Sequence, residues 1–356
     1  MVQLYQFNYK GHEDAPGVPI ITSENAEEVA ANGCARSTVK ETYEFILGDL
    51  NKAIELLANT KKTRSDKRYV SLDVAYGIRA RVHLTMHNYA DALKDAEAAL
   101  ASTSSVPYSS AAVSKPTFID IEDASWMWGI LITDKDRVST TGICNFPSHM
   151  GSLNYGYASV GGWRRISPKL YNQIPESDVR KGWFLDDTGV SVNLPAAAQA
   201  YITKKGAPVY TQVKYGPMND EWGSNNNATD VILMRVEEMY LIKAEAQAMN
   251  NDVSGGVNTL NSFVNTYRDP SYKCTATTGE AVQEAVWHQR RIEFWGEGLA
   301  YFDIMRLNKG VNRLGCGFPK TAVFNIAAGD PVQIYSIPNK DCLLYTSPSP
   351  RDGLLS

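Results

Sequence analysis

One stretch, Trp287 to Lys309, constrains the fold of this chain more than any other. Its sequence, WHQRRIEFWGEGLAYFDIMRLNK, places charged residues directly among aromatic ones. On a helix with 3.6 residues per turn, one face would carry Trp287, Arg291, Trp295, Gly298, Phe302 and Met305. Glycine inside a helix costs about 1 kcal/mol relative to alanine, so Gly296 and Gly298 indicate the close approach of another backbone or ring. The stretch is therefore predicted to be one central helix with partly buried, paired charges.

Two carboxylates of this stretch invite a catalytic interpretation. Glu293 and Glu297 lie one helical turn apart, a spacing that would suit the paired carboxylates of a glycoside hydrolase. A general acid needs a raised pKa, whereas nearby cations lower it. Arg290, Arg291 and Arg306 are close in the sequence and would keep both carboxylates ionised. We therefore expect a structural ion-pair network and assign no catalytic residue.

The composition is that of an ordinary globular protein and excludes some classes of function. The 356 residues are 44% hydrophobic and 21% charged, with a net charge of −4, so no surface for nucleic acid is expected. The five cysteines are scattered without metal-ligand spacing, and the histidine pair His83 and His87 straddles a predicted turn. No phosphate-binding glycine motif is present. We expect no metal and no cofactor.

Both ends of the chain look like interruptions of a longer protein. Residues 342–352 read CLLYTSPSPRD, which resembles the translation of a transposase library adapter. Residues 342–356 are therefore excluded from fold reasoning. The chain also begins with a pattern typical of the middle of a helix, without a cap. We expect a fragment with one domain, residues 1–341.

The N-terminal part, residues 1–101, reads as helical. A helix is predicted to open at Ser37 or Thr38, with Glu41 placed for a capping box. Two further helices, Leu72 to Met86 and Tyr89 to Leu100, form a pair that resembles a tetratricopeptide repeat, because small residues fall where such helices touch. These are Ala80, Ala92, Ala96 and Ala99.

The rest of the domain divides into a loop-rich insertion and a second helical part. Residues 102–229 are rich in Gly, Ser, Pro, Asn and aromatics, with strands expected at Ser125 to Thr133 and at Tyr210 to Tyr215. In residues 230–341, a second repeat-like pair is predicted to begin at Val231. The predicted fold class is mainly α, with repeat-like helical pairs interrupted by a long insertion.

Several ordered segments resemble the SusD/RagB family. The family motif near the C-terminal third is matched by Arg290, Arg291, Glu293, Glu297, Gly298, Phe302, Asp303 and Arg306. Four further segments agree in order: Gly11 to Thr22, Tyr171 to Phe184, Asp230 to Ala246, and Val332 to Asn339. The resemblance covers residues 1–341.

This resemblance implies a function as well as a fold. Members of the family are lipid-anchored on the outer face of the outer membrane, bind glycans or other nutrients, and cap a SusC-type TonB-dependent transporter. The chain lacks the lipoprotein signal and the first helices of that pattern, so its membrane attachment would be through an anchor outside this sequence. The resemblance thus implies a non-enzymatic cell-surface protein that binds an oligosaccharide and delivers it to the transporter.

Ligand contacts are expected from the insertion, because binding residues favour loops held on a rigid scaffold. Aromatic rings can stack on a sugar while amide and guanidinium groups bond its hydroxyls. The candidates for glycan binding are Asn154, Tyr155, Tyr157, Trp163, Arg164, Trp222 and Asn225. The alternative for each ring is that it pins its loop to the scaffold. Trp126, Trp128 and Trp183 are assigned to the core.

Two other functions remain open from the sequence. The helical pairs could form a protein interaction module that binds no glycan, with the insertion as a partner surface. An all-helical glycan-cleaving enzyme is the second alternative, and Glu297 would then be required for the release of reducing ends.

Overall fold

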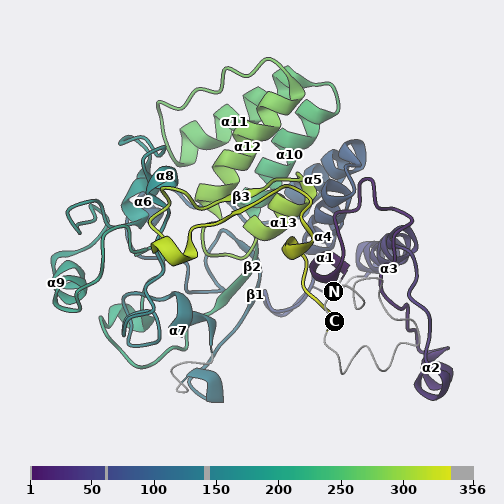
Figure 1. The fold of residues 1–356 in the computed structure, drawn as a ribbon, viewed down its shortest axis with the longest axis horizontal. Coiled ribbons are helices and arrows are strands. Elements are labelled where there is room, and N and C mark those ends of the chain that lie inside the picture. The colour runs from purple at the N-terminus through teal and green to yellow at the C-terminus, as the bar shows by residue number, and fades with distance from the viewer. Residues whose placement is uncertain (1, 61–62, 140–144, 338–356) are drawn as a thin grey trace.

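The computed structural model describes residues 2–60, 63–139 and 145–337, and most of their regular structure is helical (Figure 1). The α-helices are α1 (Val2–Tyr5), α2 (Ala26–Asn32), α3 (Val39–Asn59), α4 (Leu72–Thr85), α5 (Tyr89–Ser102), α6 (Ser110–Val113), α7 (Phe146–Met150), α8 (Pro168–Tyr171), α9 (Ala196–Lys204), α10 (Val236–Met249), α11 (Val253–Tyr267), α12 (Gly279–Glu293) and α13 (Ala300–Arg306). The strands are β1 (Trp126–Ile130), β2 (Val231–Arg235), β3 (Val311–Asn312) and β4 (Asn325–Ile326). The predicted mainly α fold is confirmed.

The start of α3 shows how local sequence sets an element. The Thr38 side chain accepts a hydrogen bond from the Glu41 amide at 3.1 Å. In return, the Glu41 carboxylate accepts one from the Thr38 amide at 2.8 Å. This reciprocal pair satisfies two amides that the first turn leaves without helical partners. The predicted capping box is confirmed, with Thr38 as the cap.

The two repeat-like pairs are neighbours in space although they are far apart in the sequence. Helix α4 packs on α5, α10 packs on α11, and α10 also packs against α5 and α12. The predicted small residues Ala80, Ala92, Ala96 and Ala99 are buried. In the second pair, Ala244, Ala246 and Ala248 are buried as well. In Figure 1 these helices form one scaffold, while α7 and α9 lie apart from it at the lower left.

The second pair begins later than predicted. Residues Val231–Arg235 form β2, which pairs antiparallel with β1, and α10 starts only at Val236. The apolar run of β2 suits a strand as well as a helix, and pairing with β1 decides between them. The strand predicted at Tyr210 to Tyr215 is wrong as a named element. Its residues make only isolated bridges, with Arg165, Phe184 and Thr117.

The prediction of one continuous helix from Trp287 to Lys309 is also wrong. Helix α12 ends at Glu293 and α13 begins at Ala300, with a tight turn between them. Gly296 and Gly298 have φ of 80° and 82°, a left-handed conformation that glycine adopts without steric cost. The two glycines therefore allow the turn that separates α12 from α13. Gly296 additionally lies close to Met150 and Tyr215, as the predicted close approach requires.

Of the three tryptophans assigned to the core, two are fully buried. Trp126 and Trp183 are 0% and 1% exposed, whereas Trp128 is half-buried and donates its indole N–H to the Arg68 carbonyl. The predicted adapter tail and the last two residues of the Val332 to Asn339 segment lie outside the described residues. Among the helices within the described ranges, none is long and apolar enough to cross a bilayer.

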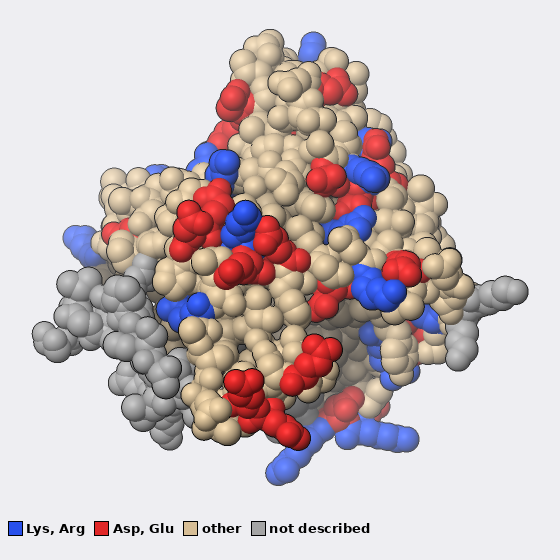
Figure 2. Space-filling model, turned by 90° about the vertical axis from the view of Figure 1, so that its right-hand side faces the viewer, with Lys and Arg blue, Asp and Glu red and all other residues tan. Residues whose placement is uncertain are grey.

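The surface on the right of Figure 1 carries a mixture of charges. Figure 2 shows acidic and basic side chains interspersed over this face. Nucleic-acid binders usually present a continuous basic stripe, and the described residues drawn on this face do not form one.

Candidate functional site

The structure brings the predicted ligand-binding residues together on two neighbouring loops. Residues 148–164 and 219–227 join through backbone hydrogen bonds, from the Gly223 amide to the Leu153 carbonyl at 2.8 Å and from the Tyr155 amide to the Ser224 carbonyl at 2.7 Å. The Tyr201 hydroxyl on α9 donates to the Asn154 carbonyl at 3.3 Å. Because these bonds fix the backbone, the loops form one rigid surface rather than two separate segments.

Two candidate rings are exposed on this surface. Tyr155 is 50% exposed and Tyr157 is 44% exposed. The Lys205 ammonium lies 5.8 Å from the Tyr155 ring centre, while His149 and the Arg164 guanidinium lie 4.9 Å and 5.8 Å from the Tyr157 ring centre. We name Tyr155 and Tyr157 the exposed tyrosine surface. Its rings are held in place by neighbouring polar groups and still offer area to a ligand.

Four of the other five predicted residues make contacts that hold the loops. Trp163 and Trp222 are partly buried against a small core formed by Leu153, Leu185, Ile202 and Val213. Asn154 is 1% exposed and donates its amide to the Asn227 side-chain oxygen at 2.7 Å, so it does not reach the surface. Arg164 is half-buried and donates to the His149 carbonyl at 3.1 Å. Asn225 is exposed.

The family-motif carboxylates are buried in an ion-pair network at the end of α12. Glu293 is 0% exposed. Its two oxygens meet Arg268 at 2.7 and 2.8 Å, Arg235 at 3.1 Å and Arg180 at 3.3 Å. Arg235 also meets Glu297 at 2.9 Å and 3.1 Å. These arginines come from η2 (Val179–Trp183), β2 and the end of α11, so one carboxylate joins three distant segments.

Lys214 completes this network from the insertion. It is 0% exposed, and its ammonium donates to the Glu297 carboxylate at 2.6 Å and to the Glu293 and Trp295 carbonyls at 3.0 and 3.1 Å. Burial lowers the pKa of Lys214 to about 8, although the Glu297 charge opposes the change. All three ammonium protons therefore have acceptors, which is the condition under which a buried charge is tolerated.

The predicted partner of Glu293 within its own helix is wrong. Arg290 instead meets Asp303 at 2.7 Å and Glu238 at 3.6 Å. Arg306 meets Asp303 at 2.8 Å and also contacts Glu245. Two further motif residues lie on the periphery: the Arg291 guanidinium stacks 4.7 Å from the Trp287 ring centre, and Phe302 packs edge-on to Tyr301. Arg290 and Glu293 are thus not ion-pair partners although they are three residues apart, whereas Asp303 and Arg306, also three residues apart, are.

The environment of these carboxylates keeps them ionised. Burial alone would raise the pKa of Glu293, but Arg268, Arg235 and Arg180 lower it well below its usual range. The same balance, with Arg235 and Lys214 as the cations, lowers the pKa of Glu297. A catalytic acid needs the opposite shift. The arrangement is that of a buried structural network, in which each oxygen already has a cationic partner.

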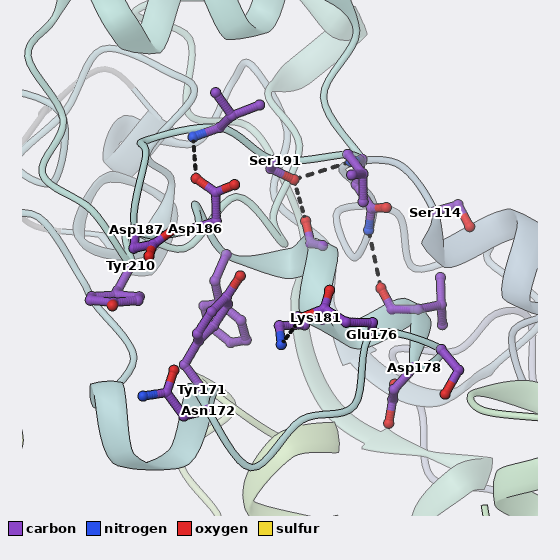
Figure 3. A pocket seen from close by; sticks show the side chains of 17 residues that line it. Ser114, Tyr171, Asn172, Glu176, Asp178, Lys181, Asp186, Asp187, Ser191 and Tyr210 are labelled. Carbon is purple, nitrogen blue, oxygen red and sulfur yellow. Dashed lines mark hydrogen bonds and ion pairs between the residues drawn. The ribbon is translucent and has the colours of Figure 1, made fainter. Parts of the chain in front are cut away.

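A pocket of about 500 Å³ lies elsewhere in the insertion, and the sequence reasoning missed it (Figure 3). Its walls come from the end of α8, from the stretch 176–193 and from Tyr210. Tyr171 and Tyr210 pack with ring centres 5.1 Å apart. Figure 3 shows Tyr171 between Tyr210 on one side and Lys181 on the other. We name this cavity the acidic pocket, after Glu176, Asp178, Asp186 and Asp187 in its lining.

One sequence signal pointed toward the acidic pocket. Asp186 and Asp187 precede Thr188 and Gly189, a composition typical of a tight turn that presents carboxylates. Tyr210 lines the same pocket with a backbone φ of 66°, a conformation that a tyrosine rarely adopts. No local sequence pattern predicts this conformation. Among the described residues, no group of three or more His, Cys, Asp or Glu side chains is placed to hold a metal ion.

Comparison with known proteins identifies the family. The model described as the SusD family matches residues 170–336, and one described as starch-binding associating with the outer membrane matches residues 1–84. This chain belongs to the SusD/RagB family. The network joining Arg180, Arg235, Glu293 and Glu297 lies within the first of these matches. No curated protein sequence matches the chain.

Solved structures share the fold of this SusD/RagB chain. A SusD-like carbohydrate binding protein from Bacteroides vulgatus superposes with a TM-score of 0.77 at 23% identity, over 96% of this chain and 72% of that one. A SusD superfamily protein from Bacteroides thetaiotaomicron gives 0.75 at 22% identity, with the same coverage. One from Bacteroides fragilis gives 0.65 at 21%, over 96% and 71%.

Proposed function

We propose that this protein captures an oligosaccharide at the cell surface and passes it to a TonB-dependent transporter of the outer membrane. Membership of the SusD/RagB family supports glycan binding, since one matching family description names starch-binding and association with the outer membrane. A solved structure of the same fold is described as a carbohydrate binding protein. Anchoring would be through a lipid on the full-length protein, and the partner would be a SusC-type transporter.

The exposed tyrosine surface is the observation that carries the proposal. Tyr155 and Tyr157 are half exposed on loops that backbone hydrogen bonds hold rigid. A rigid exposed ring loses little conformational entropy when a sugar stacks on it. Asn225 is exposed on the adjoining loop and supplies an amide for hydroxyl groups. We therefore assign the first ligand contacts to these three residues.

Affinity electrophoresis of the 356-residue chain against a panel of neutral polysaccharides tests this assignment. Tyr155→Ala and Tyr157→Ala should each weaken binding about tenfold, the equivalent of about 1.4 kcal/mol. Tyr69→Ala is the matched control, because Tyr69 is 56% exposed on a different part of the molecule. Absence of binding to every polysaccharide would instead favour a protein interaction module.

Delivery to the transporter is tested in the full-length protein. Pull-down of an outer-membrane TonB-dependent transporter with the lipidated protein is the expected result. The enzyme alternative has its own test: release of reducing ends from any polysaccharide, abolished by Glu297→Gln, would overturn the proposal of a non-enzymatic protein.

A further inference from the structure

The acidic pocket has the size and walls of a small-ligand site. Its volume of about 500 Å³ lies within the range of about 300–1,000 Å³ usual for such sites. It shares no lining residue with the exposed tyrosine surface. The half-buried Tyr210 forms one wall, and Asn172, Asp186 and Asp187 supply polar groups around it (Figure 3). The pocket is thus a second place in the insertion where a ring and hydrogen-bonding groups converge.

The Tyr210 ring, which forms the aromatic wall of the pocket, is supported by neighbouring residues. Tyr171 is 7% exposed and packs against Tyr210 at 5.1 Å between ring centres. The Tyr210 backbone is fixed on both sides, because its amide donates to the Leu185 carbonyl and its carbonyl accepts from the Ile166 amide, both at 3.0 Å. The Tyr210 ring is therefore positioned before any ligand arrives, which reduces the entropic cost of stacking.

The charges in the pocket do not balance. Glu176 is paired with Lys181, and Asp178 is paired with Arg180. One carboxylate oxygen of Asp186 accepts hydrogen bonds within its own turn, from Thr188 and Val190.

Asp187 is exposed and has no hydrogen-bond or ion-pair partner among the residues that the structure describes. Within the described part of the chain, neither Asp186 nor Asp187 has an ion-pair partner, so two negative charges remain unpaired there. Both charges act on Tyr171 in the pocket lining. Burial first, and then Asp186, Glu176 and Asp187, raise the pKa of Tyr171 to about 12. A carboxylate-bearing or sulfated sugar would be repelled here, whereas a protonated amine would gain a charge-assisted hydrogen bond.

We propose that the acidic pocket binds a sugar residue carrying a protonated amine, with the sugar ring against Tyr210 and the ammonium group toward Asp186 and Asp187. This inference rests on the proposed function only in taking the ligand to be a glycan. It assigns the ligand to a separate site and adds a charge preference that the exposed tyrosine surface does not supply.

Isothermal titration calorimetry of the 356-residue chain with three hexasaccharides tests the inference. The probes are β-1,4-linked glucosamine, its fully N-acetylated counterpart and an oligogalacturonate, at pH 6 and low ionic strength. The glucosamine hexamer should bind at least tenfold more tightly than the other two. The preference should weaken with added salt, since exposed charges are screened.

Asp187→Asn removes the charge while keeping the shape of the side chain. It should weaken binding of the glucosamine hexamer about tenfold and leave the N-acetylated hexamer unchanged. Asp49→Asn is the matched control, because Asp49 is an exposed carboxylate on α3, which Figure 1 places on the opposite side of the molecule from α8. Melting temperatures of both variants show whether they are folded.

Each remaining outcome contradicts the inference. Equal affinity for the three hexamers, or tight glucosamine binding that Asp187→Asn does not change, rules out the acidic pocket as the amine site. If a neutral polysaccharide still binds and depends on Tyr155 and Tyr157, the proposed function survives that failure. If no glycan of either panel binds, both proposals fall.

Discussion

At the scale of single residues, Gly296 and Gly298 distinguish two structural reasons for a glycine: a left-handed backbone conformation and a close neighbouring side chain. Both have φ near 80°, so alanine at either position would cost about 1–2 kcal/mol in backbone strain. A Cβ at position 298 would meet nothing within 4 Å, whereas one at position 296 would lie 2.7 Å from the Met150 side chain and 3.0 Å from the Tyr215 hydroxyl. Urea unfolding should show a larger loss for Gly296→Ala than for Gly298→Ala. Equal losses would mean that neighbouring side chains simply move aside.

His288 predicts an acid sensitivity of the fold. Burial, followed by the charges of Arg291 and Arg180, lowers the pKa of His288 to about 4, against about 6.5 in an unfolded chain. Between pH 6.5 and 4 the unfolded chain therefore takes up a proton that the native state refuses, and stability falls as pH falls. The loss is at most about 3 kcal/mol. Unfolding in urea at pH 7 and pH 4.5 measures it, and His288→Gln should flatten this part of the profile.

At the scale of elements, Glu293 is the point where η2, β2, α11 and α12 meet. Glu293→Gln keeps the shape but leaves Arg180, Arg235 and Arg268 with one carboxylate fewer. The free energy of unfolding should fall by about 3–5 kcal/mol, as is usual when one partner of a buried ion pair is removed.

The control for Glu293→Gln is Glu284→Gln. Glu284 is on the same helix, its side chain is 56% exposed, and it pairs with Lys309. Surface pairs contribute about 0–1 kcal/mol. Comparable losses in the two variants, measured by chemical unfolding, would mean that the network adds no more than a surface pair.

The sequence predicted elements well where the signal is local and poorly where it depends on distant contacts. The capping box at Thr38 and Glu41 is readable because both partners lie within one turn. The break between α12 and α13 could not be read from the sequence, because glycine predicts either close packing or a left-handed turn. Strand β2 could not be predicted either, since only its pairing with β1 distinguishes it from an extension of α10. The burial of charge at Glu293 was predictable, but its partners come from segments that only the fold brings together.

At the scale of the whole molecule, the candidate site was likewise predictable where its signal is local and unpredictable where it depends on distant contacts. The sequence located candidates between Asn154 and Arg164 and at Trp222 and Asn225, because glycine-flanked aromatics stand out within the insertion. It did not separate exposed rings such as Tyr155 from rings that hold the loops, such as Trp163. The acidic pocket was missed altogether, because Tyr171 and Tyr210 are 39 positions apart and meet only through the fold.

Lys214 links the insertion to the helical scaffold and thereby connects the family motif with the ligand-binding loops. Its neighbours Thr211 and Gln212 bridge to Arg165 and Phe184, while its ammonium binds the turn after α12. Lys214→Met would leave two buried carbonyls without this donor, at a cost of about 1–3 kcal/mol each. Hydrogen exchange should accelerate around residues 164–166 and 183–185, and glycan affinity should fall although the lysine touches no ligand.

The exposed Lys204→Met on α9 controls for the loss of a charge in the insertion. It should leave both hydrogen exchange and binding unchanged. A Lys214→Met protein that melts earlier but keeps slow exchange at residues 164–166 and full glycan affinity would contradict the coupling. The network would then stabilise the helices alone, and the loops would hold their shape through the backbone bonds between residues 153–155 and 223–224.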